Sequence, residues 1–62
     1  MYYNVGTKGG NRRCFPTVQE AWAWADRQVE LWVCQGAIAP VYRVDYMGTY
    51  VDREGRPEAE QR

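Results

Sequence analysis

The sequence predicts a single small α+β domain, in which one helix packs on one face of an antiparallel sheet of three or four strands. A chain of 62 residues has room for one domain. Apolar residues between positions 18 and 34 recur with helical spacing, and short β-branched and aromatic runs flank that segment on both sides. All connections are short and only one helix is available, so we expect the strands to pair antiparallel.

Two extended segments precede the helix. Residues 2–7 read YYNVGT, which favours a strand, and the following KGGN is typical of a tight turn. Residues 12–15, RRCF, either return as a hairpin partner or form a loop. The element orders β-β-α-β-β and β-α-β-β therefore both remain open.

The helix is predicted at 18–34 from its end signals. Thr17 and Glu20 have the spacing of a capping box, in which the threonine hydroxyl accepts a hydrogen bond near Glu20. Gly36 suits the left-handed position after the last turn, and Pro40 prevents the helix from resuming. Pro16 marks the other boundary.

A hairpin is expected after the helix. Residues 41–47, VYRVDYM, alternate in the manner of a half-buried strand, Gly48 permits a turn, and 49–52 return as the last strand. The segment 53–62 contains no large apolar residue. We therefore expect the domain to occupy 1–52 and residues 53–62 to form a disordered polar tail.

One stripe of the helix should face the sheet, since its members fall within an arc of about 120°. It contains Val18, Ala21, Trp22, Ala25, Val29, Trp32 and Val33. The sheet side of the core should contain Tyr3, Val5, Phe15, Tyr42, Val44 and Tyr46. High aromatic content, with three Trp, five Tyr and one Phe, lets so short a chain bury a compact core.

Trp24 and Leu31 fall outside that arc, seven residues apart and on one line of the opposite face, beside Glu20, Arg27 and Gln28. Tryptophan is common among interface anchors, so these five residues are the predicted partner-binding surface, for a foreign protein or for a second copy of the chain. The alternative is that Trp24 folds against its own helix or reaches the sheet edge.

Basic residues offer a second candidate site. Lys8, Arg12 and Arg13 surround the glycine-rich turn, where they could hold a phosphate or simply be solvated. With Arg43, they could also contact nucleic acid on the open sheet face. Eight basic and eight acidic residues give zero net charge, which disfavours nucleic-acid binding and a strongly acidic DNA mimic alike.

Composition also bears on catalysis and location. The chain has no histidine, and only Cys14 and Cys34 carry thiols, so we expect no metal, no cofactor, no catalytic residue and no enzymatic activity. Both cysteines should remain reduced and dispensable. The sequence offers neither a signal peptide nor a membrane-spanning stretch, which favours a cytoplasmic protein that does not contact membranes.

The layout of residues 2–52, with a strand, the capped helix TVQEAWAWADRQ and the hairpin VYRVDYMGTYV, resembles small accessory proteins of bacteriophages and mobile elements, including some anti-CRISPR inhibitors. The resemblance carries over no functional residue. It implies a protein with one task, which acts by occupying a surface of a host complex.

Overall fold

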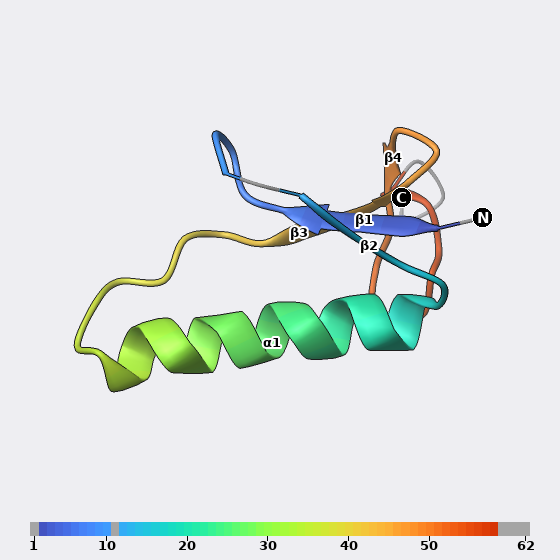
Figure 1. Cartoon of the computed structure of the whole chain (residues 1–62). Helices are drawn as coiled ribbons and strands as arrows, with labels where there is room; N and C mark the ends of the chain where they lie inside the picture. Colours follow the sequence, from blue (N-terminus) through green and yellow to red (C-terminus); the bar gives the residue numbers. More distant parts are fainter. Residues whose placement is uncertain (1, 11, 59–62) are drawn as a thin grey trace.

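The computed structural model describes residues 2–10 and 12–58. In chain order, its elements are β1 (Tyr3–Gly6), β2 (Arg13–Phe15), α1 (Val18–Cys34), β3 (Arg43–Tyr46) and β4 (Thr49–Tyr50). Figure 1 shows α1 lying across one face of the sheet, while the opposite face, here called the outer face, carries no helix from the described residues. The α+β class predicted from the sequence is confirmed.

The sheet has the strand order β2-β1-β3-β4, and every neighbouring pair is antiparallel. The first strand is therefore central, with Tyr3 opposite Phe15 on one side and opposite Tyr46 on the other. Because the segment before the helix forms a strand over Arg13–Phe15, the order β-β-α-β-β holds and the three-stranded alternative does not.

The helix begins and ends where its local signals predict. Thr17 has an extended backbone, and its hydroxyl accepts a hydrogen bond from the Glu20 amide at 3.2 Å. At the other end the Gly36 amide donates to the Val33 carbonyl and the Ala37 amide to that of Trp32, which is the Schellman pattern. Gly36 adopts the positive φ of 74° that this ending requires. Within the described ranges, no helix combines the length and the apolar character needed to cross a membrane.

The core is small and built mostly from valine and alanine. Val5 and Val44 are fully buried in the centre of the sheet, and Ala21 and Ala25 face them from the helix. Val18 and Val51 complete the buried set. Partly buried aromatic rings surround this centre, namely Tyr3, Phe15, Trp22, Trp24, Tyr42 and Tyr46.

The helix is longer than the sheet that it covers. Its 17 residues extend about 25 Å, whereas the four residues of β1 or β3 extend about 13 Å. The last turns of α1 consequently project beyond the strands, and residues 35–42 return alongside them to β3 (Figure 1). Trp32 and Val33, predicted to lie in the core, are therefore exposed, and Val29 is only half-buried. Their assignment to the core stripe fails because no strand among the described residues reaches this far.

The β3–β4 hairpin closes in two residues. Met47 and Gly48 both have positive φ, 51° and 83°, which is the backbone of a type I′ turn. This turn matches the twist of the paired strands, so a methionine is held in a conformation that normally favours glycine or asparagine.

Residues 53–58, predicted as part of a disordered tail, are instead held against the domain by polar contacts. The Asp52 carboxylate accepts from the Glu54 and Arg56 amides at 2.9 and 2.8 Å, and Val51 forms a bridge with Pro57. Arg53 donates two hydrogen bonds to Asp26 on the helix, at 2.7 and 2.8 Å. The contacts of the domain thus include residues past the predicted boundary at 52, while 59–62 lie outside the described residues.

Candidate functional site

Trp24, the predicted anchor of a partner-binding surface, lies in the helix–sheet interface. Its ring is half-buried, 5.8 Å from the ring centre of Phe15 and 5.9 Å from that of Tyr42, which it meets edge to face. The guanidinium of Arg13 lies 5.9 Å from the same ring. Its placement on the opposite face of the helix is therefore wrong, and the alternative, in which Trp24 reaches the sheet, is correct.

The physical reason is the small size of the buried helix residues. Ala21 and Ala25 allow the sheet to approach closely, and a tryptophan about 100° to either side can then reach down along the strands. Trp24 does so toward β2. Trp22 does so on the other side, where its indole donates to the Asp52 carbonyl at 3.0 Å and lies under the Arg53 guanidinium. Both tryptophans are therefore core-edge residues.

The other predicted partner-binding residues do not gather around an exposed ring. Glu20 and Arg27 are exposed, Gln28 is half-buried, and Leu31 is exposed near the projecting end of the helix. Of the five residues in that prediction, Leu31 alone presents a large and well-exposed apolar side chain. A role in binding for these residues stays a prediction.

A different set of exposed apolar side chains lies close to Leu31 along the chain. Five large apolar side chains on the projecting turns of α1 and the following segment are between 40% and 96% exposed: Leu31, Trp32, Val33, Ile38 and Val41. We call these five residues the apolar end. Sequence reasoning missed it because Trp32 and Val33 were assigned to the core and Val41 to a strand, whereas β3 begins only at Arg43.

The apolar end lies in an uncharged part of the chain. Residues 31–42, LWVCQGAIAPVY, contain no Asp, Glu, Lys or Arg, although 26% of the chain is charged. Two features fix its shape, the Schellman ending of α1 and a hydrogen bond of 3.1 Å from the Trp32 indole to the Tyr42 hydroxyl. A neutral apolar surface with a defined backbone can be desolvated without burying an unpaired charge.

Three of the four predicted basic residues meet on the outer face of the sheet. Lys8, Arg12 and Arg43 line a hollow of about 430 Å³ together with the turn residues 6–10, Asp45 and Tyr50. We call this the outer-face hollow. Arg13 is not part of it, because strand alternation directs its side chain to the helix side, over Phe15 and Trp24.

The charges of the outer-face hollow are only loosely paired. Arg12 lies 3.5 Å from the carboxylate of Asp45, and Arg43 lies 3.9 Å from that of Glu58. Asp45 is buried although it stands on the face away from the helix. The guanidinium of Arg43 also covers the Tyr50 ring, at 3.8 Å from its centre. Contacts longer than an ordinary hydrogen bond leave these groups able to bind other polar atoms.

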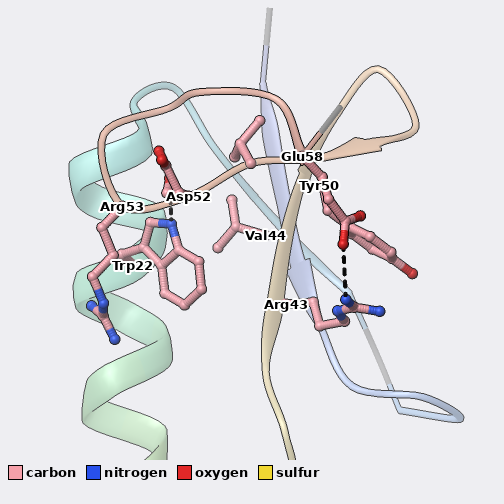
Figure 2. A pocket seen from close by; sticks show the side chains of 8 residues that line it. Trp22, Arg43, Val44, Tyr50, Asp52, Arg53 and Glu58 are labelled. Carbon is pink, nitrogen blue, oxygen red and sulfur yellow. Dashed lines mark hydrogen bonds and ion pairs between the residues drawn. The ribbon is translucent and has the colours of Figure 1, made fainter. Parts of the chain in front are cut away.

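A second hollow of about 300 Å³ adjoins the first at Arg43 and Tyr50 (Figure 2). Trp22 and Val44 lie on one side of β3, Tyr50 and the Arg43–Glu58 pair lie on the other, and residues 51–58 arch over them. Trp22 donates to the Asp52 carbonyl and Arg53 binds Asp26 on the helix, so two of its polar groups have close partners within the domain. We interpret this hollow as a seam between the sheet and the C-terminal segment.

Two carboxylates of that seam have perturbed acidity. The hydrogen bond from Arg53 lowers the pKa of Asp26, against a smaller opposing effect of desolvation. Hydrogen bonds from backbone amides, that of Arg56 first, lower the pKa of Asp52. Both shifts arise from contacts that hold residues 53–56 in place, so they indicate structural roles.

The two cysteines are exposed and unpaired with each other, and the Cys14 thiol donates to the Asn4 side chain at 2.8 Å. Within 2–10 and 12–58, no group of three or more potential metal ligands is found. Comparisons of the chain with protein-family models, with curated proteins and with solved structures gave no match.

Proposed function

We propose that the protein is a non-enzymatic binding module that holds a protein partner through the apolar end. The observation that carries the proposal is the exposure of five large apolar side chains in a stretch without charge, on a frame fixed by the helix ending. Exposed apolar surface of this kind is costly in water and is typical of sites that another protein covers.

The partner should present an apolar surface of its own, since nothing at the apolar end offers an ion pair to a charged one. The resemblance to phage accessory proteins makes a host protein complex in the cytoplasm the partner that we infer. Because the contact would form by desolvation, its affinity should change little with salt, unlike that of a nucleic-acid complex.

A pair of matched variants tests the proposal. Ile38→Lys combined with Val41→Lys places two charges on the apolar end, and Met47→Lys places one on an equally exposed residue of the distant hairpin, 79% exposed against 78% for Val41. All three positions lie outside the core, so each variant should fold. Capture from host lysate, quantified by mass spectrometry, should recover a partner with the wild type and with Met47→Lys.

The double variant should recover at least tenfold less of that partner. A desolvated charge at the core of an interface costs more than about 1.4 kcal/mol of binding free energy. Identical recoveries by the double variant and by Met47→Lys would contradict the proposal. Sedimentation of the purified chain tests whether the apolar end instead binds a second copy of the chain. Self-association that the double variant abolishes would identify a second copy as the occupant and contradict the host partner.

A further inference from the structure

The outer-face hollow brings basic side chains, the buried carboxylate of Asp45 and the ring of Tyr50 together. It lies away from the apolar end and is independent of the function proposed above. We propose that it binds a guanine nucleotide, with the phosphate held by Lys8 and Arg12 and the guanine edge held by Asp45. Its volume, about 430 Å³, falls within the range of small-molecule sites.

The phosphate end of the site follows from the balance of charge. Lys8, Arg12 and Arg43 contribute three positive charges to the hollow, against the negative charges of Asp45 and of Glu58, which is paired to Arg43. Lys8 forms no ion pair with any residue in the described ranges. Its ammonium is therefore available to an anion without breaking an existing contact.

Asp45 determines what else the ligand must carry. It is only 8% exposed, and a bare anion in the hollow would meet its negative charge at close range. A ligand that donates hydrogen bonds to this carboxylate would remove the conflict and release Arg12, now 3.5 Å away, for the phosphate. Guanine offers two parallel donors, the N1–H and the exocyclic amino group, that match the two oxygens of a carboxylate.

A flat surface for the base stands next to this carboxylate. Tyr50 is the cross-strand partner of Asp45, and the Arg43 guanidinium lies over its ring at 3.8 Å. Bases stack on aromatic rings and on guanidinium planes alike. Anion contacts from the β1–β2 connection, base-edge contacts from β3 and stacking contacts from β3 and β4 therefore surround one hollow.

Titration of the whole chain with four probes tests the proposal: inorganic phosphate, AMP, GMP, and a short single-stranded RNA with one guanosine, all followed by NMR chemical shifts. GMP should bind at least tenfold more tightly than AMP or phosphate, with shifts at residues 6–10 and at Asp45. If the RNA binds more tightly than GMP, the natural ligand is a guanosine within RNA. If GMP binds more tightly, the natural ligand is the free nucleotide.

Three variants complete the test. Lys8→Ala should weaken GMP binding fivefold or more, whereas the exposed Arg27→Ala on the helix should leave it unchanged. Asp45→Asn should remove the preference for GMP over AMP. Equal affinity for GMP, AMP and phosphate, or binding unaffected by Lys8→Ala, would overturn the proposal. Lys8 is an exposed turn residue, so Lys8→Ala should fold. It therefore tests the proposal even if Asp45→Asn does not fold.

Discussion

Replacing Trp24 by alanine should destabilise the domain severely, because its ring lies between Phe15 and Tyr42 and not in solvent. Truncating a fully buried aromatic residue costs about 3–5 kcal/mol, so the half-buried Trp24 should contribute about 2–3 kcal/mol. That figure includes two aromatic pairs of about 0.5–1.5 kcal/mol each. A domain of this size has little more than about 3–5 kcal/mol in total, so most of its stability would be lost.

Thermal and urea unfolding followed by far-UV circular dichroism measures this effect. With about 4–8 °C lost per kcal/mol in a domain of this size, Trp24→Ala should lower the Tm by about 10–20 °C. Trp32→Ala is the matched control. Its ring is 40% exposed beyond the sheet and makes one hydrogen bond, to Tyr42, so we expect a loss of about 1 kcal/mol. A Trp24→Ala variant within about 0.5 kcal/mol of the wild type would show that Trp24 does not pack in the helix–sheet interface.

Three further predictions concern the seam and the core. Since the pKa of Asp26 is lowered in the folded chain, its contribution to stability is complete above the ordinary value of 3.8 and is lost as the pH falls below it. Urea titrations between about pH 5 and pH 2 should thus show a smaller loss for Arg53→Met than for the wild type, and equal losses would contradict this. Ala25→Leu should cost about 1–3 kcal/mol, because the helix contacts the sheet through an alanine that is 2% exposed, and an unchanged Tm would show that contact to be loose. Deleting residues 53–62 should uncover Val51 and lower the Tm by about 5–10 °C, whereas a disordered tail would leave it unchanged.

The features predicted correctly from the sequence are those set by neighbouring residues. Thr17 and Glu20 are three positions apart and Gly36 directly follows the helix ending, so both ends of α1 were predictable from local rules. Alternation also placed Val44 on the helix side of β3 and Arg43 and Asp45 on the outer side.

The features that were missed depend on contacts between distant segments. The helix stripe was centred without knowing that two alanines bring the sheet close, so Trp24 was placed on the wrong side. The order of residues 53–58 depends on a 27-residue separation between Arg53 and Asp26, which no local pattern reveals.

The candidate sites follow the same division. Lys8, Arg12 and Arg43 were singled out by charge, but their shared hollow depends on the pairing of β1 with both β2 and β3, which sets Gly6 opposite Arg43. The apolar end depends on the difference in length between helix and sheet. Neither could be derived from periodicity alone.

Hydrogen–deuterium exchange of the chain, alone and with its captured partner, shows whether the apolar end is the surface that the partner covers. We expect slowed exchange on binding to be concentrated in residues 31–42, with little change in the 6–10 turn or in β2. Slowed exchange at the turn or along β2, with residues 31–42 unchanged, would contradict binding through the apolar end.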